Sequence, residues 1–201
     1  MFFESKNLLI TIKEFVKQNS EQDDIHGFPH IMRVYGLCQK IGEKLHANLK
    51  ILNTAALLHD IGRKNENDNL NHAEISAEIA LDYLYSLGDH FSNNEIEKIL
   101  HCIKAHSFSN ELLPNSLEAK ILSDIDKLDA LGAIGLYRTI GFTIKKEGGL
   151  KEVIRHLEDK ILNLPDLLYL DISKRIAEKR KKIIQEFYEE ITDESKLRNY
   201  L

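Results

Sequence analysis

Histidines on apolar helix faces are the residues of this sequence best suited to chemistry. His30 begins an apolar stripe of helical spacing that continues at Val34, and His59 extends the apolar face of the next predicted helix, so both imidazoles should point inward. Asp60 follows His59 directly, and a carboxylate near a buried face is costly unless it meets a cation. A nitrogen beside a carboxylate oxygen suits Zn, Mn, Fe or Ni better than Ca or Mg. The alternative is that Asp60 pairs with Lys or Arg and His59 only packs.

Three further histidines lie on predicted helices. Within residues 93–106, His106 falls about 70° from the centre of the apolar stripe and His101 about 150° away. We therefore expect His106 to approach a site and His101 to be exposed. His72 opens the helix predicted at 71–87 on its apolar side, where it either joins the site or bonds to backbone or solvent.

Asp124, Asp126 and Asp129 lie within six residues of a largely apolar helix predicted at 117–138. Periodicity places Asp129 nearest the centre of the inward stripe. Apolar residues on the other sides of this helix indicate that it is buried all round. The spacing therefore leaves open which of the three carboxylates faces a site.

Helical spacing dominates the elements that must position these side chains. Period-2 alternation is scarce, so the sequence predicts an all-α protein. Polar or glycine-rich breaks at 65–69, 110–116 and 148–149 are too short to be domain linkers, which predicts one domain over residues 1–201. The predicted helices cover residues 7–18, 28–46, 48–60, 71–87, 93–106, 117–138, 150–162 and 166–191.

Composition excludes several classes of function. A formal net charge of −5 lacks the basic footprint of a nucleic-acid binder. No apolar run approaches the roughly 20 residues needed to span a membrane. Residues 1–6 lack a basic leader before an apolar stretch, and Cys38 and Cys102 form no CxxC motif. Two buried thiols in a reducing compartment are therefore expected, which predicts a cytoplasmic protein.

His30, the His59-Asp60 pair and Asp126, in this order on successive helices, resemble the HD superfamily of metal-dependent phosphohydrolases. The match spans about residues 26–138, and the family's basic residue and Leu after the last Asp select Asp126 over the other two carboxylates. The resemblance implies an HD-domain-like helical bundle as the core, with additional C-terminal helices at about 150–201. It is strongest toward a subgroup of small bacterial and archaeal hydrolases.

The segments that begin at His72 and end around His106 resemble two further motifs of the two-metal HD branch. The resemblance thus implies one or two divalent transition ions (Mn, Fe, Ni, Zn or Co), with Asp60 able to bridge two. Asp60 or Asp126 would take the proton from the attacking water. The implied metal ligands are His30, His59, Asp60, His72, His106 and Asp126.

The resemblance implies hydrolysis of a phosphoester or pyrophosphate bond in a small phosphorylated molecule, with a nucleotide as the expected substrate. Two alternatives remain at this point: an HD-type two-iron oxygenase and a non-catalytic ligand-sensing domain. The expected partners include neither membrane nor nucleic acid, and a homo-oligomer is compatible with the sequence. The candidate substrate-binding residues are Arg63, Lys64, Lys127, His26 and Arg138. The alternative is that the cations are ordinary surface residues and that His26 only supports a metal ligand.

Overall fold

The computed structural model describes residues 2–65, 71–107, 110 and 112–197, with side chains omitted for 2–6 and 197. Within these residues every regular element is helical and none is a strand, which confirms the all-α prediction. The chain forms two compact units, Met1–Ile125 and Asp126–Leu201. The organisation as one domain stays a prediction.

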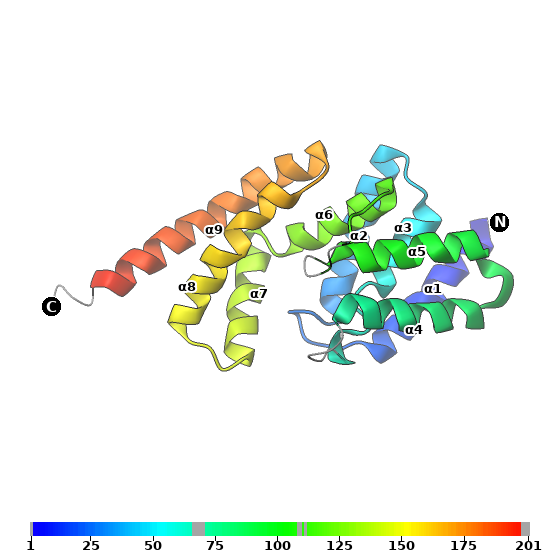
Figure 1. The fold of residues 1–201 in the computed structure, drawn as a ribbon, viewed down its shortest axis with the longest axis horizontal. Helices are drawn as coiled ribbons and strands as arrows, with labels where there is room; N and C mark the ends of the chain where they lie inside the picture. The colour runs from blue at the N-terminus through cyan, green and yellow to red at the C-terminus, as the bar shows by residue number, and fades with distance from the viewer. Residues whose placement is uncertain (1, 66–70, 108–109, 111, 198–201) are drawn as a thin grey trace. The chain divides into compact units, whose positions relative to one another are not determined.

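The first unit is built around one apolar helix, α3, which packs against α1, α2, α4 and α5. Its residues from Ile51 to Leu58 are all buried, because the neighbouring helices cover every face of this stretch. Figure 1 shows these helices as the blue to green part of the chain. The elements that contribute to this unit are α1 (Phe2–Asn19), α2 (Phe28–Leu45), α3 (Leu49–Leu58), η1 (Arg63–Asn65), α4 (His72–Ser86), η2 (Gly88–His90), α5 (Asn93–His106) and the larger part of α6 (Leu117–Asp129).

Two antiparallel helix pairs, α2–α3 and α4–α5, organise this unit. In each pair the start of the first helix lies beside the end of the second. Side-chain caps define where the helices begin: Asn48 accepts from two backbone N–H groups of α3, and Ser92 forms a reciprocal capping box with Glu95 at α5. At the end of each pair where the first helix starts, no loop joins the two helices, and we call it the open end. The histidines His30 and His59 lie at the open end of the first pair, and His72 and His106 at that of the second.

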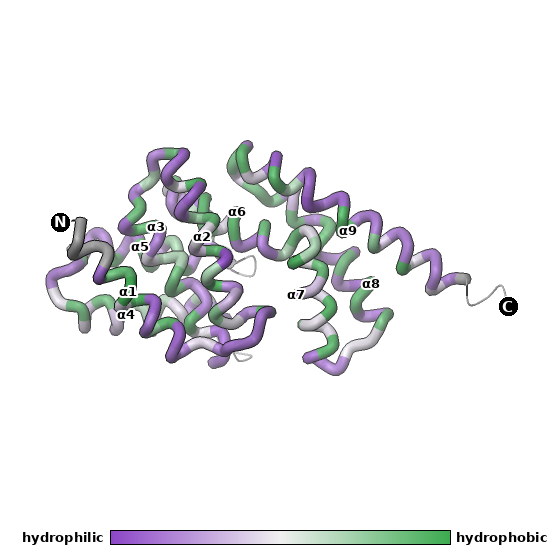
Figure 2. The backbone as a smooth tube through the Cα atoms, turned by 180° about the vertical axis from the view of Figure 1, so that it is seen from behind, coloured by the Kyte–Doolittle hydropathy of each residue, from purple (hydrophilic) through white to green (hydrophobic). Residues whose placement is uncertain are grey.

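The second unit contains α7 (Gly132–Lys145), α8 (Leu150–Asp159), η3 (Ile161–Leu167) and α9 (Asp171–Leu197). Ser173, Ala177 and Ile184 are buried along one face of α9. Figure 2 shows the matching alternation of hydrophobic and hydrophilic segments along this helix. A one-sided apolar pattern of this kind is typical of a helix that covers a core with one face.

The prediction of one continuous helix over residues 117–138 is wrong, because the helix is interrupted between α6, which ends at Asp129, and α7, which begins at Gly132. Gly132 has a φ of 74°, a left-handed conformation that favours glycine. A Cβ on Gly135 would overlap the backbone of Ala130. The two glycines thus allow a turn inside what reads as one helical pattern.

Other boundaries shift as well. The helix expected at 150–162 ends at Asp159, and the helix expected at 166–191 begins only at Asp171 and runs to Leu197. The 3-10 segment η3 occupies the interval and contains Pro165. The break at 148–149 separates α7 from α8 as predicted. The predicted loop at 65–69 lies largely outside the described residues.

Among the described residues no helix combines the length and apolar character needed to cross a membrane. Cys38 and Cys102 are buried and are not joined in a disulfide. Burial raises the pKa of the Cys102 thiol to about 12.

Candidate metal centre

The open ends of the two helix pairs bring together side chains from four helices. His30 lies in the first turn of α2 and His59 caps the end of α3. His72 is the first residue of α4, and His106 is the last residue of α5. With Asp60 these side chains form a compact group in which each is between 0% and 4% exposed. His30 and His59 are buried, as their apolar stripes predicted, and His106 lies buried beside them. The role of these side chains as metal ligands stays a prediction.

One oxygen of Asp60 faces the first helix pair. Asp60 Oδ2 lies 3.6 Å from Nε2 of His30 and 3.9 Å from Nε2 of His59. The two Nε2 atoms are 3.3 Å apart. These three donors can converge on one point, and we call them the first triad.

The other oxygen of Asp60 faces the second helix pair. Asp60 Oδ1 lies 3.5 Å from Nε2 of His72 and 3.6 Å from Nε2 of His106. These donors form the second triad. A single carboxylate is therefore shared between two sets of imidazoles, one on each of its oxygens.

The backbone sets the orientation of two of the imidazoles. His59 Nδ1 lies 2.9 Å from the carbonyl oxygen of Ala56, and His106 Nδ1 is bonded to the carbonyl oxygen of Ile103. A carbonyl oxygen only accepts, so Nδ1 must carry the proton in both rings. Nε2 then keeps its lone pair on the side of Asp60, which is the form that binds a metal ion.

The spacing of the donors fits divalent transition ions. Two ligands each about 2.1 Å from one ion lie about 3.0–3.9 Å apart for angles of roughly 90–135°. All three separations in the first triad and both separations from Asp60 Oδ1 in the second, 3.3–3.9 Å, fall within this range. They also exceed the length of ordinary hydrogen bonds. Nitrogen and carboxylate donors together favour Mn, Fe, Co, Ni or Zn over Ca or Mg.

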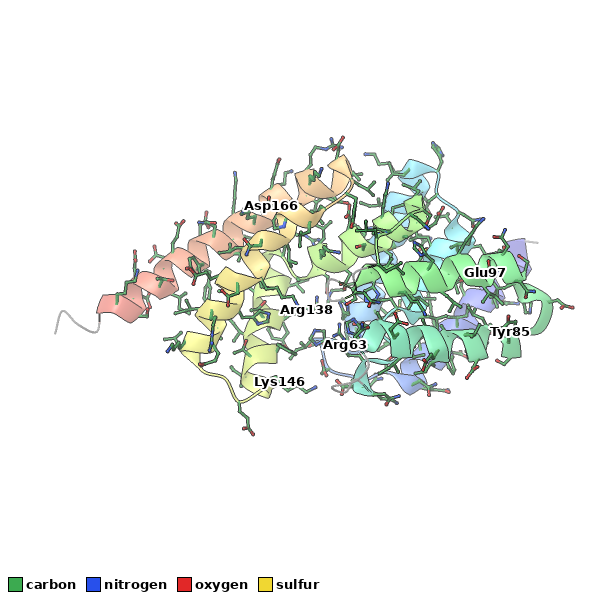
Figure 3. All side chains as sticks on the ribbon, viewed as in Figure 1. Arg63, Tyr85, Glu97, Arg138, Lys146 and Asp166 are labelled. Atoms are coloured by element: carbon green, nitrogen blue, oxygen red, sulfur yellow. The ribbon has the colours of Figure 1, made fainter. Side chains whose placement is uncertain are left out.

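The surroundings of Asp60 keep its carboxylate ionised. Burial raises its pKa and the charge of the Arg63 guanidinium beside it lowers it, and on balance the pKa lies well below its usual value. Nε and one terminal nitrogen of Arg63 each donate to Asp60 Oδ2 at 3.3 Å. Arg63 lies beside the start of α4 (Figure 3). This residue, predicted to bind substrate, therefore contacts the shared carboxylate directly.

The turn after Asp60 is held against α4 by a contact that the sequence did not indicate. The backbone N–H of Gly62 donates to Ser76 Oγ at 3.0 Å, and Ser76 is fully buried. A Cβ on Gly62 would lie 2.6 Å from the backbone nitrogen of Ser76. Glycine thus permits a close approach that links the His59-Asp60 turn to the helix that carries His72.

Other predicted residues of the first unit lie around this group. The ring of His26 meets that of His30 edge to face at 6.3 Å between centroids, and Lys64 is exposed. His101 was expected to be exposed, but it is half-buried. Its Nε2 accepts the backbone N–H of Asn115 at 3.2 Å, because the connection to α6 passes over this face of α5.

The remaining predicted residues belong to the second unit. Asp126, its first residue, is half-buried, and Lys127 is buried. Arg138 donates to the buried Asp129 carboxylate at 2.9 Å. Asp124, which closes the first unit with Ile125, is fully buried. The selection of Asp126 as a metal ligand stays a prediction, as do the substrate roles of Lys127 and Arg138.

Comparison with known proteins identifies the class. The model of the HD domain matches residues 27–131, so the chain belongs to the HD domain family. It is 30% identical to the uncharacterized protein YpgQ of Bacillus subtilis over 180 residues, which cover 86% of this chain and 85% of YpgQ. The crystal structure of YpgQ in complex with ADP is similar with a TM-score of 0.77 and 28% identity, over 94% of this chain and 96% of that one.

Two other relatives extend the comparison. The crystal structure of an HD-superfamily hydrolase from Bacillus thuringiensis is similar with a TM-score of 0.72 and 29% identity, over 96% of this chain and 98% of that chain. Ribonuclease Y of Treponema denticola is 28% identical over 125 residues, which are 62% of this chain but 22% of that enzyme. The resemblance to the HD superfamily seen in the sequence is thereby confirmed.

Proposed function

We propose that this protein is a metal-dependent phosphohydrolase that cleaves a phosphoester or pyrophosphate bond in a nucleotide or similar small phosphorylated molecule. The observation that carries the proposal is the sharing of Asp60 between two buried triads, one on each carboxylate oxygen. Two adjacent cation sites match the requirement of phosphoryl transfer, in which both the nucleophile and the phosphate charge need stabilisation.

The relatives support the reaction class and the substrate class. The Bacillus thuringiensis protein is described as an HD-superfamily hydrolase, and YpgQ was crystallised with ADP. A nucleotide therefore suits a protein that shares the fold over nearly its whole length with YpgQ. We further propose a cytoplasmic location, in line with two buried thiols that form no disulfide.

The residues of this chain would act in distinct ways. Divalent ions, when bound, supply hydroxide at neutral pH and polarise a phosphoryl oxygen. His30, His59, His72 and His106 would hold these ions through Nε2. Asp60 would hold both, and we propose that Asp60 or Asp126 accepts the proton of the attacking water. The proposed phosphate contacts are Arg63, Lys64, Lys127, His26 and Arg138.

The test is phosphate or pyrophosphate release from nucleotides, phosphomonoesters and phosphodiesters with added Mn²⁺, after measurement of the metal content by elemental analysis. We expect Asp60→Ala and His59→Ala to lower activity by more than the roughly 10- to 100-fold typical of outer-sphere changes. His90→Ala, which alters an exposed histidine, is the control and should retain activity.

Other outcomes would redirect the assignment. Full activity of metal-free Asp60→Ala protein would contradict the proposal. Bound iron with oxygen uptake linked to a substrate would instead favour a two-iron oxygenase. A wild-type protein with no bound metal and no turnover of any phosphoester would favour a ligand-sensing domain.

A further inference from the structure

A network of polar side chains ties the start of α4 to the end of α5. Asn71 Nδ2 donates to Asn110 Oδ1 at 2.9 Å. Asn110 Nδ2 donates to Glu74 Oε1 at 3.2 Å and to the carbonyl oxygen of Lys104 at 2.9 Å. Lys104 Nζ lies 2.9 Å from Glu74 Oε2. Asn110, which belongs to neither helix, is bonded to both.

The direction of each bond in this network is determined by its neighbours. Asn71 Oδ1 accepts the backbone N–H groups of Ala73 and Glu74 as the cap of α4, so its amide nitrogen must point toward Asn110. Oδ1 of Asn110 is then the acceptor, and its amide nitrogen must face the Glu74 carboxylate and the Lys104 carbonyl. Both hydrogens of that nitrogen are used, so the position requires an amide rather than a carboxylate.

The network lies next to the histidines of the second triad in the sequence. Asn71 immediately precedes His72, and Lys104 lies two residues before His106. The rings of these histidines are 5.4 Å apart between centroids. Any change in the separation of the two helix ends would therefore be transmitted to the distance between their Nε2 atoms. The first triad takes both of its histidines from α2 and α3, which contribute nothing to the network.

We propose that Asn110 is a positioning residue for the second triad: it sets the separation of His72 and His106 and so the affinity of that triad for its ion. The inference rests on the two-ion site of the proposed function. Hydrogen-bonding groups around metal ligands change affinity by roughly 10- to 100-fold when they are removed. An effect of that size should fall on one ion of two.

The experiment is a Mn²⁺ titration of the full chain, with free Mn²⁺ followed by electron paramagnetic resonance. The wild type should bind two ions per chain. Asn110→Asp keeps the size of the side chain but sets a carboxylate against Glu74 and the Lys104 carbonyl. We expect the affinity for the second ion to fall roughly 10- to 100-fold while the first is unchanged.

Two further variants sharpen the result. Asn115→Asp makes the same chemical change at an exposed residue before α6, and it should bind both ions like the wild type. Glu74→Gln keeps an oxygen that can accept from Asn110 and loses only the charge partner of Lys104. Its second ion should therefore be weakened less than in Asn110→Asp.

The outcomes separate this inference from the proposed function. A wild type that binds fewer than two ions contradicts the two-ion site itself. Two ions in the wild type with equal losses at both sites of Asn110→Asp, or with no loss, overturn the role of Asn110. Far-UV circular dichroism checks the fold. If Asn110→Asp is not helical, the ratio of the two affinities is read in Asn110→Ser, which removes the bonds without adding a charge.

Discussion

The carboxylate of Asp60 presents one oxygen to each triad. Its ionisation also affects the free energy of unfolding of the metal-free protein. Burial raises its pKa and the neighbouring charge of Arg63 lowers it, and in the folded chain the pKa is well below the ordinary value of 3.8. A carboxyl group with a lowered folded pKa stabilises the fold above its unfolded pKa. That contribution is lost as the pH falls through the folded value.

This sign leads to a test with acid. On going from about pH 5 to about pH 3, the metal-free wild type should lose more of its free energy of unfolding than Asp60→Asn, which has no proton to bind at this position. Urea unfolding at each pH measures the difference. Asp89→Asn, at an exposed carboxylate, should follow the wild type. Parallel curves for wild type and Asp60→Asn would show that the environment of Asp60 does not favour its ionised form.

At the scale of the residue, the direction of a side chain could be predicted where a single helix determines it. The stripes through His30 and His59 pointed inward, and His106 lies at the site although it falls to one side of its own stripe. The prediction that His101 is exposed was wrong, because a segment distant in the sequence, at Asn115, covers this residue. The contacts of Ser76 and Asn110 could not be predicted from the sequence, because they are hydrogen bonds to residues that become adjacent only after folding.

At the scale of elements, the contact between the turn at Gly62 and α4 determines how closely the two helix pairs approach. Gly62→Ala would force a Cβ against the backbone of Ser76. We expect it to lower the free energy of unfolding by about 1–3 kcal/mol and to weaken metal binding, because the turn carries Asp60. Denaturant unfolding and Mn²⁺ titration measure the two effects.

Gly36 provides the matched control. It lies inside α2, and a Cβ at this position would meet nothing within 4 Å. Gly36→Ala should therefore raise the free energy of unfolding by about 0.5–1 kcal/mol, because alanine favours a helix over glycine. Equal effects of the two substitutions would contradict the role given to the close contact at Gly62.

The helices themselves were predicted well where the apolar residues form a one-sided stripe, as in α2 and α5. The break between α6 and α7 was missed because an isolated glycine in a helical pattern is compatible with a continuous helix. The left-handed conformation of Gly132 depends on packing in the second unit, where the side chain of Arg180 lies against it. Periodicity along one helix contains no information about that contact.

For the molecule as a whole, ion binding should appear as added stability. A ligand that binds only the folded chain stabilises it by about 2.7 kcal/mol when its concentration is about 100 times its Kd. We expect Mn²⁺ to raise the Tm of the wild type, and a chelator to reverse the shift. Asp60→Ala, which removes the donor common to both triads, should show no such rise in differential scanning calorimetry. A Tm that is independent of Mn²⁺ in the wild type would argue against a site that forms on folding.

The antiparallel pairing of the helices gives the two triads unequal origins. His30, His59 and Asp60 all come from one helical hairpin and the residue that follows it, whereas His72 and His106 must be brought to Asp60 by a second hairpin. Loss of the contact between the α2–α3 and α4–α5 hairpins would therefore remove two ligands of the second triad and none of the first. A protein in which only the α4–α5 hairpin has separated would therefore still bind one ion, at the first triad.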